Sequence, residues 1–245
     1  MKLLTCATNR SSQALLLVVC FSIAIASNAE ENETSLGGGL GLGSDYTFRG
    51  VSQTMGNHSV QAYVDIGHPS GLYAYVWGSN IDFVPEGDPD DGARYEINLA
   101  IGYSANISDK WTVDLALVRY LYPGTIDNAD YDFNEMIATL WFSEKYSATV
   151  AFSNNVDNTN ADSLLYELGA SFDLLAETSL QLKYGYYDLS NAYGSAYSYT
   201  SATLTRSIGN TAIMLNYVDT HDSADLIFDE RVIGPRYVFS LHIDW

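Results

Sequence analysis

The chain has 245 residues, of which 30 are acidic and 11 basic, and its formal net charge is −19. This balance excludes nucleic acid as a partner, because its recognition needs a basic surface, and it excludes docking to an anionic membrane surface. An aromatic content of 13% argues against disorder, and a chain of this length is expected to form one all-β domain.

The first 29 residues, 1–29, have the features of a secretory signal peptide. Two basic residues precede an almost wholly apolar run at 14–26, and small residues at 27–29 suit signal peptidase. The apolar run is too short for a comfortable spanning helix, although an uncleaved anchor is the alternative. Both cysteines lie in this segment, so the mature chain, 30–245, is expected to lack disulfides.

From residue 36 onward, apolar and polar residues alternate, which is the period of a β-strand with two different faces. In 95–103, every second residue is large and apolar, and those between them are small, polar or charged. We predict about twelve such strands, with lengths that suit tilted membrane strands. They are 36–48, 60–67, 72–83, 94–107, 111–121, 133–143, 146–153, 164–175, 178–187, 199–208, 211–218 and 235–245.

The connections between these strands alternate between short turns and long, acidic loops. The short turns are 68–71, 108–110, 144–145, 176–177 and 209–210, and the long loops are 49–59, 84–93, 122–132, 154–163, 188–198 and 219–234. Short periplasmic turns and long extracellular loops are typical of an outer-membrane antiparallel β-barrel. An aromatic-rich soluble sandwich is the alternative, but it has no reason to alternate its loop lengths.

Aromatic residues gather near the expected strand ends, where a membrane barrel has interfacial girdles. They are Tyr46, Phe48, Tyr103, Trp111, Phe142, Tyr146, Phe172, Tyr217 and Trp245. The last strand carries apolar residues at alternate positions and ends on an aromatic one: Tyr237, Phe239, Leu241, Ile243 and Trp245. Such an ending is the signal that the barrel-assembly machinery reads, so we expect that machinery and outer-membrane lipids as partners.

Three segments of the first half carry a resemblance to a known family. Residues 44–54 read SDYTFRGVSQT, residues 71–80 read GLYAYVWGSN, and residues 120–124 read YLYPG. These segments resemble the Gcw_chp family, also called TorF-like putative porins, of proteobacterial outer membranes. The resemblance implies an outer-membrane barrel but no residue roles, because the substrate of the family is generally unassigned.

The alternation also predicts which residues of the first strand face the lumen. Leu40, Leu42, Tyr46 and Phe48 share the lipid-facing parity, whereas glycines at 39, 41 and 43 share the inward parity with Asp45 and Arg49. A row of glycines leaves the inner wall thin, so that a neighbouring side chain or a solute can approach closely.

Charged residues with inward parity are the candidates to line the lumen. The basic ones are Arg49, Arg94, Lys183 and Arg236, and the acidic ones are Asp45, Asp65, Glu96, Asp114, Glu135, Glu167 and Asp173. We expect Arg49, Arg94 and Arg236 to form a basic patch inside the outer mouth, which would favour anions or bind a carboxylate. The alternative is a lumen plugged by mutual ion pairs.

The sequence indicates no cofactor, metal or catalytic site. The histidines at 58, 68, 221 and 242 stand in no Ser–His–acid spacing, and the acidic stretch 86–92 lacks the EF-hand spacing. About twelve strands give a lumen between those of eight-stranded and 16-stranded barrels, so we expect a narrow porin or channel for small polar solutes. A non-conducting structural or adhesive barrel is the alternative, and a membrane-embedded lipid enzyme is a further one.

Overall fold

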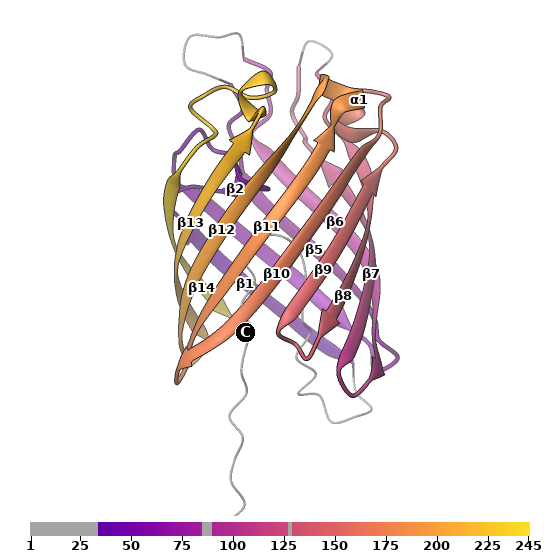
Figure 1. Cartoon of the computed structure of the whole chain (residues 1–245), viewed down its shortest axis with the longest axis vertical. Coiled ribbons are helices and arrows are strands. Elements are labelled where there is room, and N and C mark those ends of the chain that lie inside the picture. Colours follow the sequence, from indigo (N-terminus) through magenta and orange to yellow (C-terminus); the bar gives the residue numbers. More distant parts are fainter. Residues whose placement is uncertain (1–33, 85–89, 127–128) are drawn as a thin grey trace, which may run out of the picture.

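The structure is a computed structural model that describes residues 34–84, 90–126 and 129–245. The expected signal peptide, 1–29, lies outside the described residues. Twelve strands form a closed antiparallel barrel (Figure 1), which confirms the predicted fold class. Among the described residues, no helix is long and apolar enough to cross a membrane.

Each barrel strand pairs with the next one along the chain, and β1 closes the ring against β14. The barrel strands are β1 (Ser35–Gly43), β4 (Ser59–Gly67), β5 (Leu72–Asn80), β6 (Tyr95–Ser108), β7 (Trp111–Leu121), β8 (Phe133–Phe142), β9 (Tyr146–Ser153), β10 (Ser163–Leu175), β11 (Thr178–Leu189), β12 (Ser195–Ile208), β13 (Thr211–Asp222) and β14 (Arg236–Asp244). A separate hairpin consists of β2 (Thr47–Phe48) and β3 (Val51–Ser52), and the short helices are η1 (Val156–Asn158), α1 (Ser190–Tyr193) and η2 (Ala224–Leu226).

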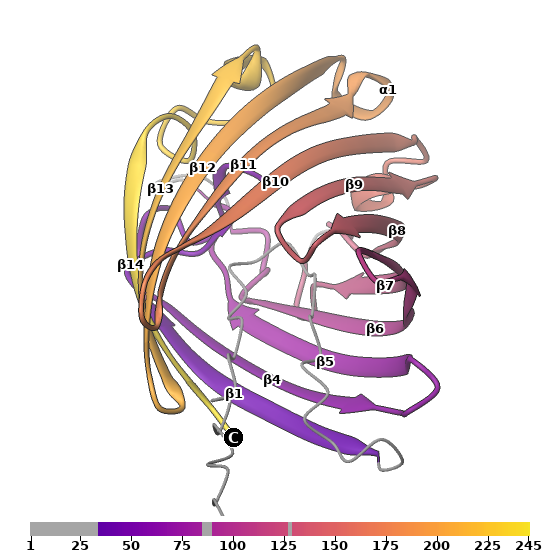
Figure 2. The ribbon, with the colours of Figure 1, turned by 60° about the horizontal axis from the view of Figure 1, so that its bottom comes forward.

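The two faces of the barrel wall differ in the way that the alternation predicts. On β6, Tyr95, Leu99 and Ile101 are exposed on the outer face, whereas Glu96 and Asn98 are buried on the inner face. Large apolar residues outside and polar residues inside are the inverse of a soluble protein, and this arrangement suits a wall that contacts lipid. Figure 2, with the bottom of the barrel turned forward, shows the strands enclosing the interior.

The chain reverses through short turns at one rim and through longer segments at the other. The short-turn rim carries 68–71, 109–110, 143–145, 176–177 and 209–210. Of the described residues, the long-loop rim carries 44–58, 81–84, 90–94, 122–126, 129–132, 154–162, 190–194 and 223–235. The connection predicted at 188–198 is shorter than expected, because β11 and β12 both extend into it and α1 fills what remains. Elsewhere the predicted alternation is confirmed.

The first predicted strand, 36–48, is wrong at its end. It stops at Gly43, and residues 44–58, which we call the inward segment, turn into the barrel instead of continuing the wall. Tyr46 is only 2% exposed and Phe48 packs against the buried core, so neither faces lipid nor belongs to an interfacial girdle. Parity alone could not show this, because a chain that leaves the wall keeps its alternation of residue types.

Candidate functional site in the barrel lumen

The inward segment reaches the opposite wall through Arg49. Its Nη2 atom lies 2.7 Å from Oε2 of Glu135 on β8, a strand five places from β1 around the ring. The guanidinium also lies over two rings, with its central carbon 4.6 Å from the centre of Phe48 and 4.5 Å from that of Tyr187. Arg49 is therefore a buried, paired cation that fixes the segment across the lumen.

The turn that presents Arg49 is tight. Arg49 has a φ of 49° and Gly50 a φ of 89°, a left-handed conformation that an arginine seldom adopts. The hydroxyl of Tyr197 donates to the backbone oxygen of Arg49 at 3.0 Å. A Cβ at Gly50 would lie 2.7 Å from the Tyr199 side chain, so this position needs glycine both for its φ and for its space.

Asp45 holds the start of the same segment. Its Oδ1 atom accepts hydrogen bonds from the hydroxyls of Ser52 at 2.7 Å and Thr54 at 2.8 Å. Its Oδ2 atom lies 3.0 Å from Nη1 of Arg236 at the start of β14. The carboxylate thus joins both ends of the β2–β3 hairpin to the wall.

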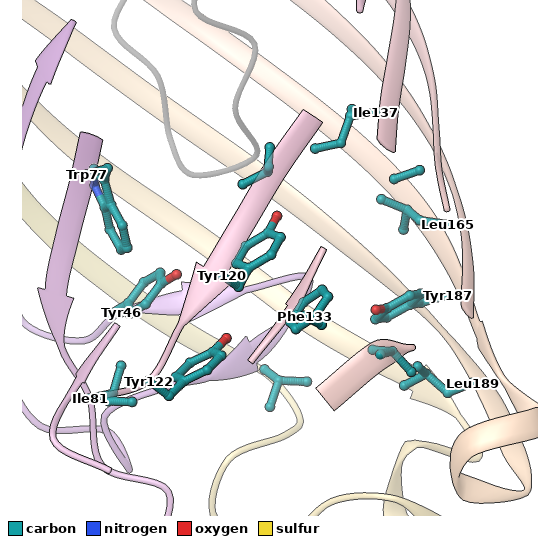
Figure 3. Close-up of a cluster of buried hydrophobic side chains, with 14 of the residues drawn as sticks. Tyr46, Trp77, Ile81, Tyr120, Tyr122, Phe133, Ile137, Leu165, Tyr187 and Leu189 are labelled. Atoms are coloured by element: carbon teal, nitrogen blue, oxygen red, sulfur yellow. The ribbon is translucent and has the colours of Figure 1, made fainter. Parts of the chain in front are cut away.

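Aromatic side chains from several strands cluster with Tyr46 of the inward segment inside the barrel (Figure 3). We call this set the aromatic layer, and its members are Tyr46, Trp77, Tyr120, Tyr122, Phe133, Tyr187 and Tyr197. All are less than a tenth exposed. Tyr120 and Phe133 stack with ring centres 4.4 Å apart, and Tyr46 and Trp77 lie 5.3 Å apart. At this level the barrel interior is packed with side chains, so any passage for a solute is narrow.

Five carboxylates of the inner wall each accept a hydrogen bond from a tyrosine hydroxyl. The pairs are Tyr46 with Glu96 at 3.0 Å, Tyr63 with Asp244 at 2.9 Å, Tyr73 with Asp114 at 2.9 Å, Tyr120 with Glu135 at 3.2 Å and Tyr199 with Glu167 at 2.6 Å. A charge-assisted hydrogen bond of this kind fixes the orientation of the carboxylate. The inner wall is therefore a set of oriented oxygen acceptors.

Three of these pairs span a glycine on the strand between them. Tyr199 on β12 lies opposite Gly185 on β11, which lies opposite Glu167 on β10. A Cβ at Gly185 would lie 2.3 Å from the Tyr199 ring, so the tyrosine can lie flat over the wall only because the side chain there is a hydrogen.

The same relationship occurs at two other places in the barrel. Tyr63 passes over Gly39 to Asp244, and Tyr73 passes over Gly102 to Asp114. The predicted close approach at the glycine row is therefore made by side chains of adjacent strands. We did not predict these pairs, although the signal is present in the sequence as a tyrosine, a glycine and an acid at inward parity on consecutive strands.

The predicted basic patch of Arg49, Arg94 and Arg236 does not form. Arg94 is 47% exposed, and its Nη2 atom pairs at 2.6 Å with Asp90 in the preceding loop. Arg94 lies just before β6 and its side chain is exposed beside that loop. Arg49 and Arg236, in contrast, each bind a carboxylate inside the barrel. The two remaining arginines are thus neutralised separately.

The other lumen candidates lie at different depths. Nζ of Lys183 lies 3.0 Å from Oε1 of Glu167 within the lumen, and Glu96 is almost fully buried at the level of the aromatic layer. Asp65 is half-buried and leans over Gly37 near the short-turn rim, and Asp173 is exposed close to the same rim. All of these residues have inward parity in the sequence, but only the structure shows which of them lie deep in the lumen and which lie at the rim.

The charges of the inner wall do not cancel. Three buried or half-buried cations, Arg49, Lys183 and Arg236, each form a salt bridge with one carboxylate. Glu96 and Asp114 are also buried on the inner wall, and among the described residues neither forms a salt bridge. The wall consequently carries more acidic than basic groups.

A small cavity adjoins the start of the inward segment. It has a volume of about 30 Å³, which is room for one or two water molecules. Its lining includes the polar residues Asp45, Gln61, Asn216 and His242.

The geometry gives little support to a catalytic site. His58 is exposed at the long-loop end of β4, whereas His242 is half-buried near the short-turn end of β14. In the described ranges, no three His, Cys, Asp or Glu side chains form a group that could hold a metal ion.

A family model described as a bacterial protein of unknown function, Gcw_chp, matches residues 28–237. The chain belongs to the Gcw_chp family. This result confirms the family that the segments of the first half suggested, while the TorF-like and proteobacterial assignments stay predictions. No curated protein sequence matches this Gcw_chp chain.

Two solved porin structures resemble the Gcw_chp barrel in fold. The NanC porin aligns with a TM-score of 0.56 at 9% identity, over 86% of this chain and 99% of that one. The KdgM porin aligns with a TM-score of 0.52 at 6% identity, over 86% of this chain and 98% of that one. At such low identity the likeness shows a porin-like barrel fold, and it transfers no solute.

Proposed function

We propose that this Gcw_chp barrel is a narrow outer-membrane channel for small polar solutes, with the inward segment as its constriction. The observation that carries the proposal is the wall itself: it is closed, apolar on its outer face, and lined inside by carboxylates, hydroxyls and paired cations. An outer face of this kind needs lipid, and an inner face of this kind needs water or polar solutes. The fold shared with two porins supports the same reading.

The constriction follows from the path of the inward segment. Because Arg49 reaches Glu135 on a nearly opposite strand, the segment divides the lumen and does not lie along one wall. Twelve strands enclose less space than the 16 or so strands of open porins. A solute that passes beside this segment must be small, and it meets polar oxygens on its way.

In this proposal the barrel stands in the outer membrane with its short turns in the periplasm and its long loops outside. Its partners are then the lipids of the outer face and the machinery that inserts barrels. Tyr237, Phe239 and Trp245 are exposed on the outer face at the C-terminal end, where an assembly signal would have to be accessible.

A non-conducting structural barrel is the competing candidate, and one observation favours it. The aromatic layer is packed closely around the inward segment, with Tyr46, Tyr120 and Tyr197 at most 2% exposed. If that packing persists in the membrane, the lumen is a plugged interior whose charges serve stability.

Recording from purified, refolded protein in planar lipid bilayers separates the two candidates. A channel gives discrete current steps of uniform size, and a heat-denatured sample of the same preparation gives none. A folded protein that inserts but stays silent at every voltage would contradict the channel and favour the plugged barrel.

A further inference from the structure

We infer that this channel prefers cations and that two carboxylates on neighbouring strands, Glu96 on β6 and Asp114 on β7, set the preference. The inference rests on the proposed channel function and names the class of solute: small cations and polar molecules that carry a positive charge. It reverses the expectation drawn from the arginines alone, because those arginines are neutralised where they stand.

The first support is the arrangement of charge around the ring. Arg49, Lys183 and Arg236 are each held by a carboxylate at 3.0 Å or less, so each contributes little net field at a distance. Glu96 and Asp114 form no salt bridge with any described residue. Their charge is therefore not compensated by a neighbouring cation, and a narrow lumen with low-dielectric walls concentrates its field.

The second support is that several buried oxygen acceptors of this wall have no hydrogen-bond donor among the described residues. Oδ1 of Asn98, Oδ2 of Asp114 and Oε1 of Glu135 are buried and accept no hydrogen bond from the described part of the chain. Their side chains are at most 5% exposed. Buried acceptors are normally satisfied, so the free oxygens of Asn98 and Asp114 call for a donor or a cation, whereas the Glu135 carboxylate already binds Arg49. Asn98 lies opposite Tyr120, and Asp114 lies opposite Ser104, nearer the short-turn rim.

The third support is the way in which the acceptors are oriented. Tyr46 donates to Oε2 of Glu96 and Asn98 donates to Oε1, while Tyr73 donates to Oδ1 of Asp114. These hydrogen bonds fix each carboxylate in one orientation. In Asp114 the second oxygen is left without a protein donor, and a fixed oxygen is a better ligand than a mobile one because less rotamer entropy is lost on binding.

The approach to the lumen carries the same sign of charge. Asp130, Asp162, Asp219 and Asp225 lie on or beside the long loops, and the chain as a whole has a net charge of −19. An acidic rim raises the local concentration of cations and lowers that of anions. The charge of the rim and the charge of the inner wall therefore both favour cations over anions.

The reversal potential in a KCl gradient at about pH 8, well above the ordinary pKa of carboxyl groups, tests the inference. The wild type should prefer K⁺ to Cl⁻. The change Asp114→Asn should remove part of this preference, and Glu96→Gln together with Asp114→Asn should remove most of it. The control Asp109→Asn, in the exposed turn between β6 and β7, removes the same charge outside the lumen and should leave the reversal potential nearly unchanged.

The outcomes are distinct. A conducting wild type without preference, or with a preference for anions, overturns the inference but leaves the channel standing. A double variant that conducts with unchanged selectivity also overturns it. A folded wild type that never conducts overturns the channel itself. If the double variant does not fold, the comparison of Asp114→Asn with the charge-preserving Asp114→Glu decides, because only the first should lower the cation preference.

Discussion

Arg49 and Glu135 are 86 positions apart in the sequence, and their side chains meet at 2.7 Å inside the barrel. Both are almost fully buried, and the Nε and Nη1 atoms of the arginine donate no hydrogen bond to any described residue. The pair is therefore the main electrostatic attachment between the inward segment and the far wall.

Replacing Arg49 by methionine should destabilise the barrel, because it leaves Glu135 buried without its cation. Breaking a buried pair from one side costs about 3–5 kcal/mol, which urea unfolding followed by the heat-dependent mobility of the barrel on gels would measure. The exposed pair of Arg231 with Asp229 provides the control, since Arg231→Ala at the surface should change stability by at most about 1 kcal/mol.

A double replacement separates the loss of the pair from a general loss of packing. Arg49→Met combined with Glu135→Leu removes both charges, so no unpaired group stays buried and most of the lost stability should return. A double variant that is no more stable than Arg49→Met would contradict the assignment of the cost to Glu135.

The glycine beneath Tyr199 offers a second test. In Gly185→Ala, the new methyl group would lie 2.3 Å from the Tyr199 ring and would push its hydroxyl away from Glu167. Overpacking of this kind costs about 1–3 kcal/mol. The matched control is Gly169→Ala two positions from Glu167, where the methyl group meets only the rotatable Ser147 hydroxyl. Equal losses in the two variants would show that the Tyr199 contact is not special.

The contact between two long-loop segments should depend on pH. Burial raises the pKa of Asp157 in η1 to about 6, although Tyr193 of α1 donates a hydrogen bond to it at 2.8 Å. Since this folded-state pKa lies above the unfolded value, the stabilising contribution is fully present below about pH 4 and is lost as pH rises through about 6.

Hydrogen exchange in residues 154–162, corrected for its intrinsic pH dependence, measures this effect. Exchange should be slower at about pH 5 than at about pH 7 in the wild type, and Asp157→Asn should remove the difference. Faster exchange at the lower pH would show that the sign of the argument is wrong.

The C-terminal residue gives a prediction about assembly. The Trp245 ring is 67% exposed, its backbone nitrogen donates to Gly38 at 3.0 Å, and a Cβ on Gly38 would lie 2.9 Å from the ring. Deletion of Trp245 should lower the amount of folded barrel in outer-membrane fractions, whereas Trp245→Phe should keep it. Normal amounts after the deletion would remove this residue from the assembly signal.

Much of the wall could be predicted from sequence because the alternation along a strand and the turns between strands each depend on residues close together in the chain. The alternation from Tyr95 to Tyr103 records which side of a strand meets lipid, and the turns at 176–177 and 209–210 record where the chain reverses. The inward path of Tyr46 and Phe48 could not be predicted in this way. It depends on contacts from Asp45 to Arg236 and from Arg49 to Glu135, which bring together positions far apart in the chain.

The same distinction explains the error over the basic patch. Parity placed Arg49, Arg94 and Arg236 on one face, but it held no information on their partners. Arg94 pairs with a residue four positions away in its own loop, whereas the other two pair across the barrel. The net charge of the lumen depends on which charged residues of different strands pair with one another, and the sequence of a single strand does not show this.

Single-channel recording of the wild type beside Arg49→Met is the most direct test of a channel constricted by the inward segment. We predict discrete steps from the wild type and larger steps, with a stronger preference for cations, from the variant, because the segment loses its attachment and Glu135 loses its counter-charge. Folded, inserted samples of both proteins that pass no current, or steps of identical size and selectivity, would contradict this account.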